Sequence, residues 1–140
     1  MSDASRQLAG ILFVVIPTIE FGGWSLLRMI ARRIPGYLDN PVRQNLFRAG
    51  HAHAGVLLVL SLVYHLHLDR TGYSDRVKWL AGGLLQAGIL AQSGGFFIHL
   101  GLGQPNRSSL GTVVTRLGAV LNAAALVILA VGLLRSGRRD

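Results

Sequence analysis

The sequence predicts an all-α membrane protein, a bundle of four transmembrane helices that run alternately up and down. Of the 140 residues, 51% are hydrophobic and only 14% are charged, and the mean hydropathy is +0.46. A soluble domain ordinarily carries about 25% charged residues, so this composition indicates a chain built for lipid. The apolar residues gather in four runs, each long enough to cross a hydrocarbon core about 30 Å thick. We interpret residues 1–140 as a single four-helix domain.

The four predicted spans cover residues 8–29, 46–66, 79–100 and 111–134. The first span is long, contains Glu20 and has no small-residue cleavage site, which favours a membrane span over a signal peptide. The segments between the spans, RRIPGYLDNPVRQ, DRTGYSDRVK and GQPNRSS, are polar and carry the prolines and glycines expected of turns. Aromatic rings near the ends of the spans are typical of membrane interfaces: Tyr37, Tyr64, Tyr73 and Trp79.

The composition also excludes several classes of function. The chain has no cysteine, which excludes disulfides and thiolate metal sites. Its formal charge of +8 comes from basic residues at the edges of the apolar runs, so we expect contact with lipid phosphates and no binding of nucleic acid. The basic residues divide almost evenly between the two sides, so the sequence predicts no orientation. We expect a multi-pass protein of a cell membrane, the bacterial inner or plasma membrane.

Antiparallel spans allow each polar residue to be placed at a depth. We call side A the surface that carries the N-terminus, and side B the surface that the first span reaches at its C-terminal end. From the rise per helical residue, one half of the bundle should collect most of the polar side chains. The half next to side B is predicted to hold Glu20, His51, His53, Gln92, His99 and Arg116.

Glu20 is the only glutamate in the chain and the only acid inside a predicted span. A charged side chain in the middle of a bilayer costs about 2.5 to 3.5 kcal/mol, so such residues usually face a partner or a water-filled cavity. We therefore expect Glu20 to face the bundle and to pair with Arg116 or with a histidine. The alternative is that Glu20 only holds the first and fourth helices together.

Four of the five histidines form two His-x-His pairs, His51 with His53 and His65 with His67. Side chains two residues apart on a helix point roughly 200° apart, so both members of a pair cannot face one small site. The first pair is surrounded by small residues that leave room for a neighbouring backbone or a flat cofactor: Ala49, Gly50, Ala52, Ala54 and Gly55. The second pair precedes Asp69 and Arg70, and we interpret it as lying at the surface of side A.

Histidines 14 residues apart on one helix lie nearly on one face, as His51 does with His65 and His53 with His67. This spacing resembles the haem-ligating helices of cytochrome b proteins. The stretch FRAGHAHAG also resembles the start of a haem-ligating helix in haem-copper oxidase subunits. The resemblance implies that haem b is bound for electron transfer or redox sensing, with His51 or His53 as one axial ligand and His99 as the other. It also implies that Arg48 or Arg116 pairs with the propionates.

The resemblance implies in addition that a second haem near side A would use His65 or His67 together with a partner subunit. Two other functions use the side B residues without haem. His51 or His53 with His99 and Glu20 would suit zinc, iron or copper. Alternatively, Glu20, His53, Gln92 and Asn122 would line a path for protons or a small solute.

A structural or assembly subunit, whose polar residues only join helices, is the remaining interpretation. The sequence identifies no catalytic residue. In each case we expect the lipid bilayer to surround the chain. We also expect it to associate with copies of itself or with a redox partner protein.

Overall fold

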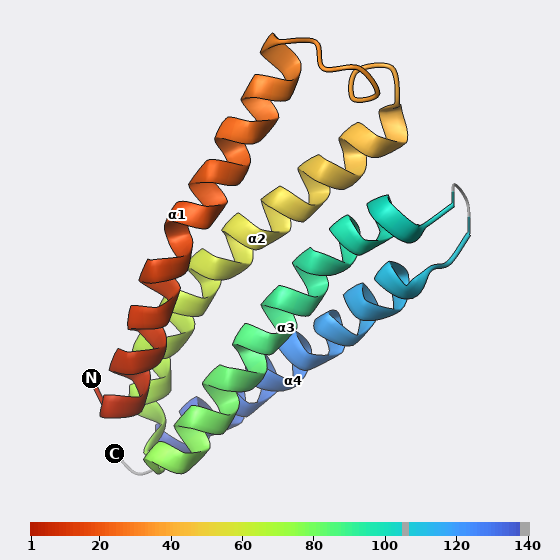
Figure 1. The fold of residues 1–140 in the computed structure, drawn as a ribbon. Coiled ribbons are helices and arrows are strands. Elements are labelled where there is room, and N and C mark those ends of the chain that lie inside the picture. The colour runs from red at the N-terminus through yellow and green to blue at the C-terminus, as the bar shows by residue number, and fades with distance from the viewer. Residues whose placement is uncertain (105–106, 138–140) are drawn as a thin grey trace.

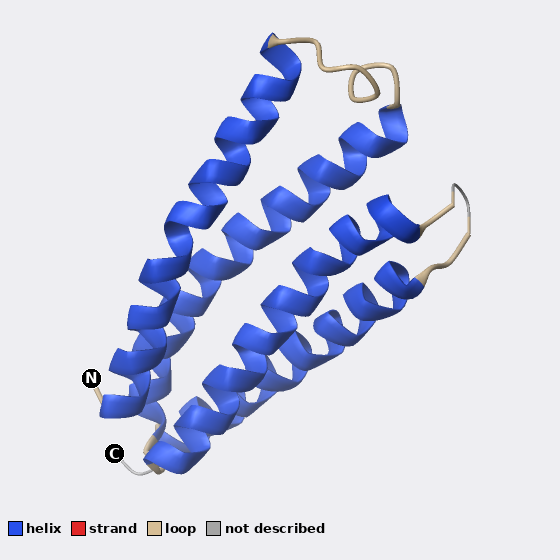
Figure 2. Cartoon of the chain, viewed as in Figure 1, coloured by secondary structure: helices blue, strands red, loops and turns tan. Residues whose placement is uncertain are grey.

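The computed structural model describes residues 1–104 and 107–137, and every regular element within those ranges is helical (Figures 1 and 2). The elements are α1 (Asp3–Ala31), α2 (Pro41–Leu68), the short 3-10 helix η1 (Asp69–Thr71), α3 (Asp75–Leu102) and α4 (Leu110–Ser136). Each of the four long helices is long and apolar enough to cross a membrane, which confirms the predicted fold class. Pro105 and Asn106 of the third connector, and the basic Arg138 and Arg139, lie outside the described residues.

Each helix begins before its predicted span and ends after it. The early starts have local causes, because a side chain caps the first turn of three of the helices. Ser2 accepts a hydrogen bond from the backbone of Ser5, Asn40 accepts one from the backbone of Arg43, and Ser109 forms a reciprocal capping box with Thr112. Hydropathy locates the part of a helix that sits in lipid, whereas these caps set where the helix itself begins.

Helices α3 and α4 form the closest pair in the bundle, because glycines bring their backbones together. A Cβ atom added to Gly118 of α4 would overlap the backbone of Gln92, and one added to Gly95 of α3 would lie 2.7 Å from the backbone nitrogen of Thr115. Glycines at helix contacts allow this kind of approach in membranes. The contact is strengthened by Asn122, whose Nδ2 donates a hydrogen bond to Oε1 of Gln92 at 2.8 Å.

Helix α1 packs closely only near side A. Its buried residues all lie in its first ten or so positions, namely Ala4, Ser5, Leu8, Ala9 and Leu12. In this region Gln86 of α3 donates a hydrogen bond to the carbonyl of Leu8 at 3.2 Å. Toward side B, α1 leans away from α3 and α4 (Figure 1). The side B half of the bundle is therefore more open than the side A half.

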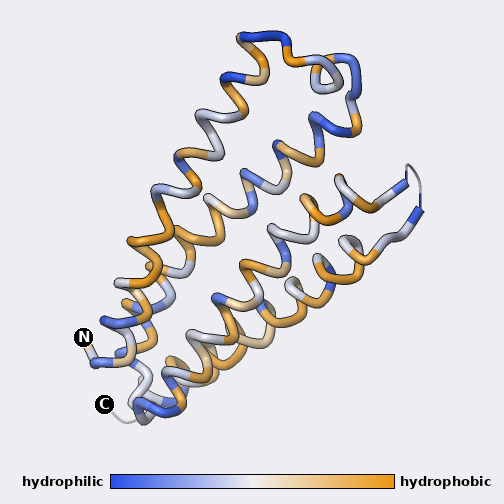
Figure 3. The backbone as a smooth tube through the Cα atoms, viewed as in Figure 1, coloured by the Kyte–Doolittle hydropathy of each residue, from blue (hydrophilic) through white to orange (hydrophobic). Residues whose placement is uncertain are grey.

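Asp69 joins three elements at side A. Its carboxylate accepts hydrogen bonds from the backbone nitrogen of Ser2 at 2.9 Å, from the hydroxyls of Ser2 and Ser5 at 2.6 and 2.8 Å, and from Lys78 Nζ at 3.2 Å. Hydrophilic residues concentrate at this end and at the opposite end of the bundle, as expected where helices leave the lipid (Figure 3). The Asp69 cluster fixes the start of α1 and of α3 to the end of α2.

Candidate functional site

His53 lies on the side of α2 that faces α3. Its ring is 4.9 Å from the ring of Phe96, centroid to centroid, and its Nδ1 lies 2.8 Å from the carbonyl oxygen of Ala49. A carbonyl oxygen can only accept, so Nδ1 carries the hydrogen and Nε2 keeps the lone pair. The backbone of α2 thus fixes both the orientation and the tautomer of this imidazole.

His51 points to a different helix, as the spacing of the pair predicts. Its ring lies against Gly22 and Gly23 of α1, where an added Cβ atom would be 3.3 Å from Nδ1 and from Nε2 respectively. The two glycines leave room for the ring between the helices. Of the first pair, His53 therefore turns toward α3 and His51 toward α1.

His99 sits in the last turn of α3, where the start of α4 holds its ring. Its Nδ1 lies 2.7 Å from Oγ of Ser109, the residue that caps α4. A Cβ atom at Gly103 would lie 2.5 Å from this same Nδ1, so the ring occupies space that only a glycine leaves open. No described hydrogen bond uses Nε2. His99, like His53, is held through Nδ1, but a hydroxyl can donate or accept, so Nε2 has a free lone pair only when Nδ1 donates to Ser109.

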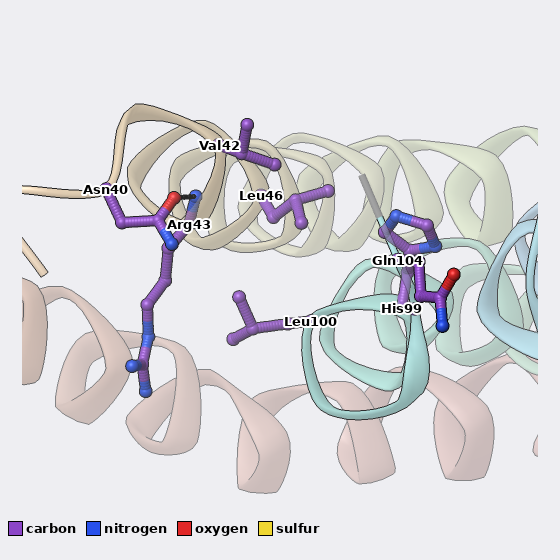
Figure 4. A pocket seen from close by; sticks show the side chains of 8 residues that line it. Asn40, Val42, Arg43, Leu46, His99, Leu100 and Gln104 are labelled. Atoms are coloured by element: carbon purple, nitrogen blue, oxygen red, sulfur yellow. Dashed lines mark hydrogen bonds between the residues drawn. The ribbon is translucent and has the colours of Figure 1, made fainter. Parts of the chain in front are cut away.

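Two pockets adjoin at His99 and Leu46, and we call them together the His99 site. The first, of about 250 Å³, lies between the start of α2 and the end of α3 (Figure 4) and is also lined by Asn40, Val42, Arg43, Leu100, Gly103 and Gln104. The second, of about 340 Å³, lies toward α4 and is also lined by Gly95, Phe96, Thr112, Thr115 and Arg116. Arg43 and Arg116 belong to different pockets, so a cation lines each side of His99. Arg48 is exposed and lines neither pocket.

Glu20 is not part of the His99 site. Its side chain is exposed on the outer face of α1 and makes no described hydrogen bond or ion pair, so the expected pairing with Arg116 does not form within the chain. The reason is the direction of α1, which turns Ile19, Gly22 and Gly23 toward α2 and leaves Glu20 roughly 100° around the helix, on an exposed flank.

The two alternative sites are likewise not assembled. Among the described residues, no three histidine, aspartate or glutamate side chains lie close enough to hold a metal ion. The non-haem set of His51 or His53 with His99 and Glu20 is therefore not brought together. Of the four residues of the polar path, a described hydrogen bond joins only Asn122 and Gln92, while His53 packs on Phe96 and Glu20 is exposed.

The second histidine pair differs from the sequence interpretation. His65 is fully buried at 0% exposure, and neither ring nitrogen has a hydrogen-bond partner among the described residues. Its ring lies against Gly82 of α3 and is 5.6 Å from the ring of Tyr64. The interpretation of His65 as a surface residue was wrong, because Gly82 lets α3 approach close enough to cover it. His67 is half-buried and makes no described hydrogen bond.

Sequence reasoning missed two residues that matter to the site. Ser109 holds His99, and its signal in the sequence was the Ser-x-x-Thr pattern just before the fourth span, which is a capping motif. Arg43 lines the His99 site because α2 begins five residues earlier than the predicted span, at Pro41. A search for a helix cap before the apolar run would have found that start.

Comparison with known proteins gives no match. No protein-family model matches the chain, and no curated protein or solved structure is similar enough to count as a match.

Proposed function

We propose that this protein binds haem b at the His99 site in a bacterial inner membrane and serves electron transfer or redox sensing. The observation that carries the proposal is the hydrogen bond from Nδ1 of His53 to the carbonyl of Ala49. Histidines that bind metals commonly donate their other ring nitrogen to a backbone carbonyl, which orients the ring and leaves Nε2 as the ligand atom. His53 has this arrangement.

His99 would hold the haem iron from the other helix. It lies on α3, which faces His53, and the hydrogen bond with Ser109 orients its ring; Nε2 would be the ligand atom when Nδ1 donates to that hydroxyl. His53 lines neither pocket of the His99 site and adjoins the site through Phe96, which packs on His53 and lines the same pocket as His99. Imidazole is a common axial ligand of haem iron. The proposal selects His53 over His51 from the pair that the sequence left open, because His51 faces α1.

Two arginines would hold the propionates. Arg116 lines the second pocket, as the resemblance implies, whereas Arg43 takes the place that the sequence gave to Arg48. A guanidinium group binds a carboxylate through two parallel hydrogen bonds and keeps its charge at every physiological pH. Arg43 and Arg116 line different pockets on the two sides of His99, so each would offer a guanidinium to one carboxylate of the ligand.

A bound haem would supply one-electron chemistry, and the chain would supply its position and its surroundings. The α2 backbone and Ser109 orient the two imidazoles, while Leu46 and Phe96 provide an apolar lining. The proposal concerns side B alone, since the ring of His65 is enclosed by its own chain. A partner protein that exchanges electrons with the haem would approach from side B.

Absorption spectroscopy on the purified protein tests this function. Protein made in cells supplied with a haem precursor should show a Soret band that sharpens on reduction. The variants His53→Ala and His99→Ala should lose most of the bound haem, whereas His51→Ala and His67→Ala, the matched controls, should keep it. Elemental analysis of the same samples distinguishes haem iron from zinc, copper or non-haem iron. A wild-type protein that is colourless and free of metal would contradict the proposal.

A further inference from the structure

The outward direction of Glu20 leaves a carboxylate without a partner inside the membrane. The residue is exposed and lies eleven positions before the end of α1, roughly 16 Å along the helix axis. A glutamate side chain is too short to reach the interface from that depth, unlike the longer side chains of lysine and arginine. A charged side chain at this depth is costly when it faces only acyl chains.

No neighbour on α1 relieves this charge. Arg28 lies on the same outer face, but it is eight residues further along, about 12 Å on the helix axis, and it stacks on the ring of Trp24 at 5.6 Å. His51 lies roughly 100° away around α1, against Gly22 and Gly23, and it makes no described hydrogen bond or ion pair with Glu20. Glu20 therefore has no described partner within the chain.

Arg116 is the exposed basic residue that lies at the same depth as Glu20. Packing contacts show which residues of neighbouring helices lie at the same depth in the bundle: Gly22 lies beside His51, Gly50 beside Phe96, and Gly95 beside Thr115. Following these contacts from α1 through α2 and α3 to α4 places Glu20 and Arg116 within about one helical turn of the same level.

Within one chain, however, Glu20 and Arg116 cannot meet. Helix α1 packs on α2 and α3, whereas α4 packs mainly on α3. Figure 1 shows α1 and α4 on opposite sides of the α2 and α3 pair. The two opposite charges therefore lie at one depth on helices at opposite sides of the bundle (Figure 1), with Arg116 on the flank of α4 that borders the second pocket.

We propose that copies of this chain associate side by side in the membrane, with α1 of one copy against α4 of the next and Glu20 paired to Arg116 of the neighbouring copy. Copies inserted in the same orientation keep both residues at the same depth, so one contact satisfies both charges. Arg48 is also exposed, but it lies more than a turn closer to side B. The contact joins two different surfaces, α1 of one copy and α4 of the next. Repeating it closes a ring when the rotation between neighbouring copies is a whole fraction of a full turn. Arg116 also lines the His99 site, and its guanidinium has donors enough for both a propionate and Glu20. Glu20 is not in that site, so the Glu20 variants test the association without changing a residue of the haem proposal.

Disulfide cross-linking tests which helices meet. The chain has no cysteine of its own, so single cysteines report without a background. Phe21 and Leu117 are exposed and follow Glu20 and Arg116 directly in the sequence. We expect membranes that contain a mixture of Phe21→Cys and Leu117→Cys chains to give a cross-linked pair on mild oxidation. The mixture of Phe21→Cys with Val56→Cys, which places the second cysteine on an exposed position of α2, should not. Equal cross-linking in both mixtures would overturn the proposal.

Charge exchange tests the pair itself. Association of fluorescently labelled copies in liposomes should weaken about threefold to eighteenfold in Glu20→Arg and in Arg116→Glu, the range found for polar contacts between membrane helices. The double variant Glu20→Arg/Arg116→Glu should recover the association, which also shows that it folds, whereas Glu20→Arg/Arg48→Glu should not. Wild-type copies that stay monomeric, single variants that associate like wild type, or equal recovery through Arg48 would each refute the pairing. Because the assay needs no haem, a failure here and a failure of the haem proposal are distinguishable.

Discussion

Replacing Asp69 with asparagine should destabilise the bundle, because this carboxylate joins α1, η1 and α3. It accepts two hydrogen bonds from Ser2 and one from Ser5, and it pairs with Lys78 at 3.2 Å. Hydrogen bonds to a charged group contribute about 1.5 to 3 kcal/mol each, and loss of one partner of a buried ion pair costs about 3 to 5 kcal/mol.

Two features of the structure place the expected loss for Asp69→Asn toward the lower end of these values. The side chains of Asp69 and Lys78 are 19% and 10% exposed, so solvent screens part of their attraction. Asparagine also keeps one oxygen that can accept a hydrogen bond from Ser2 or Ser5. We therefore expect Asp69→Asn to lower the free energy of unfolding by about 2 to 3 kcal/mol, measured by denaturation with sodium dodecyl sulfate in mixed micelles.

The control is Asp3→Asn, which removes a similar charge from a nearby ion pair. Asp3 pairs with Arg6 at 2.7 Å, but the two side chains are 72% and 68% exposed, so this change should cost no more than about 0.5 kcal/mol. If the free energy of unfolding of Asp69→Asn is as close to that of wild type as the value for Asp3→Asn is, the Asp69 carboxylate does not hold the three elements together. The double variant Asp69→Leu/Lys78→Met should recover stability relative to Asp69→Leu, because it removes the unpaired ammonium group as well.

Two further predictions concern the packing of the bundle. Gly118→Leu should reduce the helicity and the thermal midpoint of unfolding, both measured by circular dichroism, because any side chain there overlaps the backbone of Gln92. The control is Gly83→Ala, which should leave both unchanged because an added Cβ atom there meets nothing within 4 Å. His65→Leu should leave the thermal midpoint unchanged or raise it, because the buried ring has no described hydrogen-bond partner and its polar atoms cost free energy. A loss of more than about 2 kcal/mol in the free energy of unfolding would show that His65 makes a stabilising hydrogen bond that the described residues do not provide.

The number of helices, their order and their alternation could be predicted from the sequence, because hydropathy and length alone decide which segments cross a bilayer. The ends of the helices could not be predicted as closely. Residues such as Ser2 and Asn40 extend α1 and α2 beyond the apolar runs by capping the first turn, which hydropathy does not register.

The sequence also offered candidate residues for a site, but it could not assign directions to them. The spacing of His51 and His53 showed that only one could face a given neighbour, and the choice of His53 required the position of Phe96 on α3. His65 looked like a surface residue because Asp69 follows it closely, and only the contact with Gly82 shows that it is covered. The outward face of Glu20 depends on which side of α1 packs against α2, and an apolar span gives little periodicity from which to read that side.

The spin state of the bound iron tests the central claim most directly. If His53 and His99 are the two axial ligands, electron paramagnetic resonance of the oxidised wild-type protein should show the low-spin signal of iron held by two imidazoles. In His53→Ala and His99→Ala, any haem that remains should give a high-spin signal, and His51→Ala should match wild type. A high-spin wild-type signal, or a low-spin signal that survives in both the His53 and the His99 variants, would contradict this assignment.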